Sequence, residues 1–162
     1  MGLQTSVDFD FAKAVPGQVV EAISTRARAA EVAITAGLFV VQGTLDGQCK
    51  LPTSSGDVAK GMGIAVYFPA LDSQFPSGGT PGATYQIGDA LDAVSGKVWV
   101  AVEEAVSAMD PVYVRYATGS GTQKGAFRKS ADSSTAAALT GGRYLTSASA
   151  GGMALAEINI PQ

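Results

Sequence analysis

Apolar and polar residues alternate along residues 84–116, which is the pattern of short β-strands that bury one face. The first clear run places three valines on one face: Val98, Val100 and Val102. A second run follows Asp110-Pro111 and places three more apolar residues together: Val112, Val114 and Tyr116. Between two such runs, Ser95-Gly96 predicts a tight hairpin connection, because glycine accepts a positive φ without a Cβ clash.

Further apolar or alternating runs predict strands in the rest of the chain, at residues 19–23, 33–42, 61–67, 143–147 and 153–160. Asp46-Gly47 predicts a turn. The alanine-rich residues 26–32 are typical of a short helix, and Asp132 to Thr135 offer a possible helix start. Two long loops are expected at residues 68–83 and 117–142, which are rich in Pro, Gly, Ser and Thr. The fold class predicted is all-β: one barrel- or sandwich-like domain with an extended N-terminal arm, long loops and a minor helix.

Residues 1–20 are predicted to form that arm, ahead of a β-rich domain of residues 21–162. Val7, Phe9 and Phe11 alternate with polar or small neighbours until Pro16-Gly17 breaks the pattern. Such a segment cannot bury its aromatic rings alone. It therefore either forms an edge strand of its own barrel or adds a strand to a neighbouring subunit.

The loop of residues 68–83 carries two more candidates for contact with a partner, Phe68 and Phe75. Both are apolar rings in a stretch rich in Pro and Gly, where the backbone is expected to be exposed. A loop of this length inside a compact domain is usually functional or disordered.

Composition narrows the classes of partner. The chain has 162 residues, enough for one domain with its own core, and only 15% of them are charged. With 20 glycines as well, it is expected to cover much of its surface with partners. The net charge of −3 argues against nucleic-acid binding. The longest apolar run, residues 32–41, is too short to cross a membrane.

Candidate chemistry is sparse. The chain has no histidine, which excludes Ser-His and Cys-His catalysis. With only one cysteine as well, Cys49, a zinc site is improbable. A structural role is favoured for the Cys49 thiol. Arg26, Arg28 and the Lys124/Arg128/Lys129 group are expected on solvated loops. Glu103 and Glu104 are adjacent carboxylates that would point to opposite faces of a strand, so a structural use is favoured. No catalytic residue, metal or cofactor is predicted.

Several segments resemble the head decoration, or capsid cement, proteins of tailed bacteriophages. They are M-G-L-Q-T-S-V-D-F-D-F-A-K-A-V-P-G, I-G-D-A-L-D-A-V-S-G-K-V-W-V, D-P-V-Y-V-R-Y, G-A-F-R-K-S-A-D and G-G-R-Y-L-T-S-A. The resemblance spans nearly the whole chain. It implies a small β-rich subunit on the outer surface of the mature head, commonly a homotrimer between major capsid proteins, which stabilises the shell.

Two other functions stay open at this point. A carbohydrate-binding or adhesive β-module would use Trp99, Tyr113 and Tyr144 as a stacking platform, although aromatics on strands are more often core. An enzyme of unrecognised type, such as a hydrolase that uses Glu103 or Glu104, comes third.

Overall fold

The computed structural model describes residues 14–68, 84–119 and 122–160. These residues form an all-β fold with one short helix, α1 (Ser55–Ala59). The fold class predicted from the sequence is therefore confirmed. The strands, in chain order, are β1 (Val19–Ala30), β2 (Ile34–Thr35), β3 (Phe39–Gln42), β4 (Gln48–Lys50), β5 (Gly61–Ala65), β6 (Thr84–Tyr85), β7 (Ala90–Ala101), β8 (Pro111–Arg115), β9 (Phe127–Arg128), β10 (Ala136–Tyr144) and β11 (Met153–Ile158). No helix in the described part of the chain is long and apolar enough to span a membrane.

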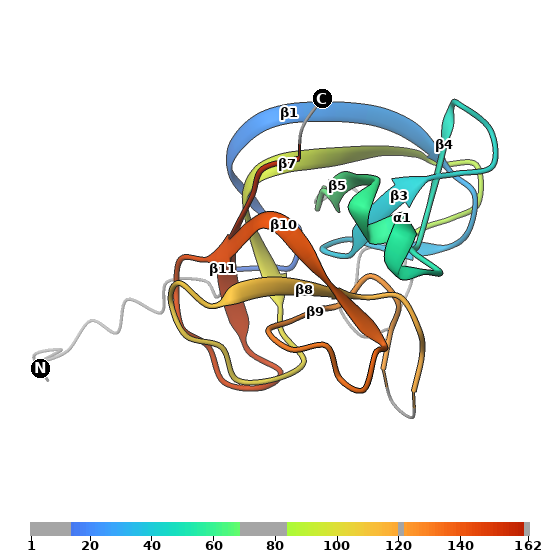
Figure 1. Ribbon diagram of the computed structural model, residues 1–162. Helices are drawn as coiled ribbons and strands as arrows, with labels where there is room; N and C mark the ends of the chain where they lie inside the picture. The colour runs from blue at the N-terminus through green and yellow to red at the C-terminus, as the bar shows by residue number, and fades with distance from the viewer. Residues whose placement is uncertain (1–13, 69–83, 120–121, 161–162) are drawn as a thin grey trace, which may run out of the picture.

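Strand β7 belongs to two rings of strands. On one side the order is β1-β4-β3-β5-β7, and β1 also pairs with β7 along most of its length, which closes the first ring. On the other side β7 continues through β11, β10, β8 and β9. A parallel bridge between Val102 and Phe127 joins the end of this second series to the residue after β7. Figure 1 shows β1 and β7 as two long bands side by side above the second series.

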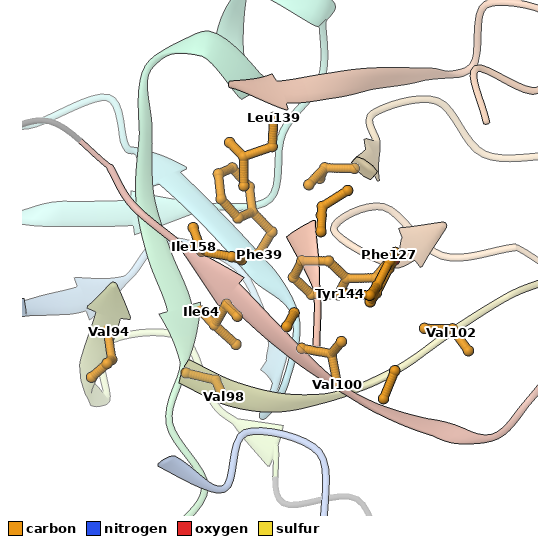
Figure 2. Close-up of a cluster of buried hydrophobic side chains, with 14 of the residues drawn as sticks. Phe39, Ile64, Val94, Val98, Val100, Val102, Phe127, Leu139, Tyr144 and Ile158 are labelled. Atoms are coloured by element: carbon orange, nitrogen blue, oxygen red, sulfur yellow. The ribbon is translucent and has the colours of Figure 1, made fainter. Parts of the chain in front are cut away.

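The predicted valine faces form the core. Val98, Val100 and Val102 are at most 1% exposed, and Val112 and Val114 are fully buried. They pack with residues of β3, β5, β10 and β11 into one cluster, part of which Figure 2 shows around Phe39, Phe127 and Tyr144. The rings of Phe39 and Phe127 meet edge to face, with centroids 6.4 Å apart.

A second cluster fills the first ring. Because successive side chains of a strand point to opposite faces, Val40 and Ala65 belong to this cluster, whereas their neighbours Phe39 and Ile64 belong to the first. Cys49 is fully buried here, and burial raises the pKa of its thiol to about 11. The prediction of a structural cysteine is consistent with both facts.

The predicted hairpin at Ser95-Gly96 is wrong. Both residues lie inside the continuous strand β7, where β1 pairs on one edge and β11 on the other. Glycine is needed at position 96 for a close approach of backbones: φ is 141°, and a Cβ would lie 2.1 Å from the Glu21 carbonyl oxygen. The fully buried Ser95 hydroxyl donates to the Ile158 carbonyl over 2.9 Å and accepts from Ile160 N over 3.1 Å.

Both predicted helical segments are also wrong. Residues 26–30 belong to β1, because pairing with β7 outweighs the helix propensity of their alanines. Asp132, Ser133 and Ser134 have positive φ values of 43°, 54° and 65°, so they form a left-handed turn before β10. The expected long loop at 117–142 contains β9 and the start of β10. The turn at Asp46-Gly47 is confirmed between β3 and β4.

We expect Gly96→Ala to lower the free energy of unfolding by about 2–4 kcal/mol, because the added Cβ must displace the Glu21 carbonyl where β1 meets β7. Urea denaturation measures the change. Gly47→Ala is the matched control, since nothing lies within 4 Å of the added Cβ there, and it should shift stability by less than about 0.5 kcal/mol. Equal effects of the two substitutions would contradict this view of Gly96.

Candidate functional site

Two segments marked by the sequence for partner contact join the described fold at one corner. Gly17 lies at the centre of this corner: its N–H donates to the Trp99 carbonyl over 2.8 Å, and its carbonyl accepts from Tyr67 N over 2.9 Å. Residues 1–13 enter just before it, and residues 69–83 follow Phe68, next to Tyr67. A Cβ at Gly17 would lie 2.7 Å from the Ala65 carbonyl oxygen, so the corner is closely packed.

Of the predicted contact residues, the structure describes one. Phe68 is 43% exposed, as the sequence suggested for an apolar ring on open backbone. Val7, Phe9, Phe11 and Phe75 lie outside the described residues. The described end of the predicted arm is part of the fold: Gln18 accepts from Trp99 N over 2.9 Å, and Val19 already belongs to β1.

An open groove of about 320 Å³ lies beside this corner. Pro16 forms part of its wall, with residues before β3, at the end of β7 and in the loop before β9. Most of these are apolar or glycine, among them Ala36, Leu38, Ala101, Val102 and Ala126. The corner thus combines two exit points of the chain with an apolar depression.

Exposed apolar side chains also mark the turns at one end of the first ring. Val32 is 38% exposed, Leu45 63% and Ile87 73%. The three turns are tied together: Glu31 accepts from Thr44 N over 2.6 Å, and Ala30 N donates to the Asp89 carbonyl over 2.9 Å. The sequence pattern did not indicate this end, because single apolar residues in turns carry no periodicity.

Glu103 and Glu104, the adjacent carboxylates, are both held by arginines. The Glu103 carboxylate accepts from Arg115 Nε over 2.8 and 2.9 Å, and Arg128 lies 3.4 Å from it. Glu104 Oε1 lies 3.3 Å from Arg128 Nε and accepts from Lys129 N and Ser130 Oγ. The structural use that the sequence favoured is what the geometry provides.

Asp132 completes this ionic cluster. Its carboxylate accepts from Arg115 Nη2 over 2.6 Å and from Arg128 Nη1 over 2.7 Å. Arg115 is only 1% exposed and Arg128 8%, so the expectation that Arg128 lies on a solvated loop is wrong. An arginine can be buried this way because its planar guanidinium donates to several carboxylates at once. The cluster fixes the left-handed turn at Asp132 against β8 and β9.

Two carboxyls of the cluster have lowered pKa values. Partial burial opposes the ionisation of Glu104, but hydrogen bonds from Ser130 and Lys129 and the charge of Arg128 outweigh it and lower its pKa. The hydrogen bond from Arg115 is the main reason that the pKa of Asp132 is lowered, and Arg128 and Thr135 add to it. Both groups are therefore ionised at neutral pH and committed to the arginines.

The proposed stacking platform for a carbohydrate does not form. Tyr144 is fully buried, its hydroxyl donates to the Arg128 carbonyl over 2.9 Å, and burial raises its pKa. Trp99 and Tyr113 are partly exposed on β7 and β8. Within the described residues, no cluster of three or more His, Cys, Asp or Glu side chains is arranged to hold a metal ion.

Comparison with known proteins gives one family. Residues 3–159 match the family described as structural cement protein (E217 gp24/Pam3 gp6). No curated protein sequence matches the chain.

Two solved structures are similar. A chain of the capsid of Myoviridae Phage XM1 is 21% identical, with a TM-score of 0.66 and coverage of 98% of both chains. A second, the N base of the head fiber gp8.5 of bacteriophage phi29, is 13% identical, with a TM-score of 0.44 and coverage of 86% of this chain and 96% of that one. At these identities the first likeness is one of fold.

We expect Arg115→Met to cost about 3–5 kcal/mol of stability, because it leaves the carboxylates of Glu103 and Asp132 without their main buried partner. Chemical denaturation measures the loss. Arg143→Met is the matched control: it breaks the ion pair with Glu157, but the Arg143 side chain is 50% exposed, so the cost should stay within about 1 kcal/mol. A mild effect at Arg115 would show that the cluster is not what holds the turn.

Acid should weaken the fold through the same cluster. Because the folded-state pKa values of Glu104 and Asp132 are lowered, their contribution is complete above the ordinary values of 4.5 and 3.8 and is lost as the pH falls through the folded values. We expect the stability gap between the native chain and Glu104→Gln to shrink between pH 7 and pH 3, as measured by urea unfolding at each pH. A gap that is constant over this range would contradict the ionised state of Glu104.

Proposed function

We propose how this chain stabilises the phage head. The chain belongs to the phage structural cement protein family and is thus a capsid-stabilising protein of the virion. It binds the outer surface of the mature shell through residues 1–13 and 69–83, which carry Val7, Phe9, Phe11 and Phe75, and through Phe68 beside them. The part of the predicted arm that precedes Gly17 acts as the arm, and the β fold from Gly17 onward acts as the rigid cement domain. The partner is the major capsid protein, and the working unit is a homotrimer.

The corner at Gly17 supports this assignment of a shell-binding arm and a rigid domain. Both aromatic segments are attached to the β fold within a few residues of one another, at a point fixed by hydrogen bonds to Trp99 and Tyr67. Two apolar segments anchored at one rigid corner can grip a surface together, because the second contact is made at high effective concentration once the first is in place.

Stabilisation then follows from mass action. A subunit that binds the expanded shell and not the immature one favours the expanded state by roughly 2.7 kcal/mol per site when its concentration is a hundredfold above Kd. It can shift the shell only by its difference in affinity for the two states. Burial of apolar arm and loop residues would provide most of the binding energy, at roughly 25 cal/mol per Å² before ordering costs. Many modest contacts repeated over a head resist the pressure of packaged DNA.

Catalysis has no part in this proposal. The adjacent carboxylates that a hydrolase would need are each held by arginine, and the charge of the cluster is used to fix the turn at Asp132. The chain also has no histidine. Adhesion by shape and apolar contact accounts for the low charged fraction of 15% without any further activity.

Deletion of residues 2–14 should abolish binding to purified heads and leave the β fold intact, because the hydrogen bonds of Gly17 and Gln18 lie outside the deletion. Co-sedimentation with heads measures occupancy, and the thermal unfolding curve of the free protein measures the fold. Gln4→Ala, a polar change in the same segment, serves as a control and should bind as the native chain does.

Undiminished occupancy by the truncated protein would reject the arm as a shell-binding element. If the truncated protein is unfolded, a second variant tests the same point: Phe9→Ser with Phe11→Ser removes the apolar contacts of the arm without shortening the chain. That variant is expected to lose occupancy to the same extent.

A further inference from the structure

The outer edge of β1 is open along most of its length. One edge of this strand pairs with β7 from Val19 to Ala29. On the other edge, β4 pairs only with Ala29 and Ala30, and no described strand pairs with residues 19–28 there. An unpaired strand edge of this length offers its N–H and C=O groups to another chain.

Two arginines on this edge have no carboxylate partner among the described residues. Arg26 and Arg28 share one face of β1, opposite Ala93 and Leu91 of β7, and no ion pair holds either of them. Arg28 donates from Nη1 only to the neighbouring Ala27 carbonyl, and its Nε is buried without any hydrogen-bond partner. A buried, unsatisfied guanidinium nitrogen is costly unless an acceptor arrives.

The chain carries a segment whose charges match this edge. Asp8 and Asp10 are spaced two residues apart, as Arg26 and Arg28 are, with Phe9 between them. In an antiparallel pairing, Asp8 beside Arg28 places Asp10 beside Arg26 on the same face. Phe9 and Phe11 then lie on the other face, beside Ala27 and Thr25, which are small and exposed.

The part of β1 involved is the regular part. Its register with β7 shifts between Val19 and Glu21 and again between Ala22 and Ser24, but it runs without interruption from Ser24 to Ala29. A strand added beside residues 24–28 therefore meets a straight edge with evenly alternating side chains.

We propose that residues 7–12 of a second copy of this chain add to the free edge of β1 as an antiparallel strand, with Asp8 beside Arg28 and Asp10 beside Arg26. This rests on the proposed function and deepens it: the strand pairing and the two aspartates hold the arm on the neighbouring subunit, and Phe9 and Phe11, on its other face, stay available for the shell. Each subunit gives its arm and receives another, which makes a head-to-tail contact, and such a contact forms a ring such as a trimer when its rotation closes.

The turn that leads into β1 does not form a hairpin with it. Gln18 N donates to the Val15 carbonyl over 3.0 Å, and this turn has Pro16 followed by Gly17 with a φ of 86°, which is typical of type II. Type II turns splay the flanking segments rather than pairing them as a hairpin. The Gly17 carbonyl, moreover, is already bound by Tyr67.

Disulfide trapping between two variants, each with one added cysteine, tests the register and the exchange together. Phe9→Cys protein mixed with Ala27→Cys protein should form a covalent heterodimer on mild oxidation, seen on a non-reducing gel, because the two positions face each other in the proposed pairing. The native Cys49 will not interfere, since it is fully buried with a pKa of about 11. Phe9→Cys mixed with Met109→Cys is the matched control, at a residue that is 66% exposed in the loop between β7 and β8, and should give no heterodimer.

Charge reversal tests the ion pairs. Asp8→Lys with Asp10→Lys should weaken self-association about tenfold in sedimentation, Arg26→Asp with Arg28→Asp should do the same, and all four changes together should restore it. Restoration also shows that the arginine changes have not unfolded the strand.

The edge proposal is overturned if the heterodimer of the Phe9→Cys and Ala27→Cys proteins does not form, if a chain that carries both substitutions closes the disulfide within one monomer, or if the variant with all four charge changes fails to recover self-association. None of these measurements is made in the presence of capsids, so they test the edge pairing separately from shell binding. A chain that occupies heads without the trapped heterodimer would refute the edge pairing and leave the cement function standing, and the opposite result would refute only the shell-binding role.

Discussion

The fold depends on strand β7, because it is the strand that both rings share. Its first half pairs with β1 and β5, and its second half with β1 and β11, so both edges of a 12-residue strand are hydrogen bonded. Gly96 allows the β1 backbone to come close at the crossover, and the buried hydroxyl of Ser95 binds the end of β11. The two core clusters lie on either side of this arrangement, so a defect in β7 would reach both.

A rigid body suits a protein whose work is adhesion. A subunit that stiffens a lattice has to transmit force between its contacts, and a closely packed interior does so because it is hard to compress. A rigid subunit also loses little conformational entropy when it binds. Several polar groups that could compromise such a core have partners inside it: Arg115 and Arg128 are paired with three carboxylates, and the hydroxyl of Tyr144 binds the Arg128 carbonyl. Arg128 Nε is buried without a hydrogen bond, although Glu104 lies 3.3 Å away. Available to partners are the corner where two aromatic segments join the fold, an apolar groove beside it, and an open strand edge.

Charge is used in two different ways in this molecule. On the outer face of β1, β7, β11 and β10, Glu21 pairs with Lys97, and Arg143 with Glu157, in a row across four strands. These exposed pairs contribute little to stability and leave the face close to neutral. Arg26 and Arg28, like Lys50, Lys60 and Lys124, have no ion pair among the described residues, and what sets the two arginines apart is that they lie together on an open strand edge.

The sequence determined what depends on local pattern. Period-2 alternation identified the buried faces of β7 and β8 and the all-β class, because these follow from which side chains must leave water. The Asp-Gly pair identified the turn at residues 46–47, because its residues suit a tight turn. The sequence also marked the aromatic segments and indicated that Glu103 and Glu104 have a structural use. Only the tertiary structure decided the rest: that Ser95-Gly96 continues a strand, that residues 26–30 are extended, that Arg128 is buried, and that Gly17 and Tyr67 meet at one corner. Each of these features depends on a residue far away in the sequence, either a paired backbone or an ion-pair partner. Propensity within a short window of sequence cannot say which distant backbone or carboxylate will lie beside a residue in the folded protein.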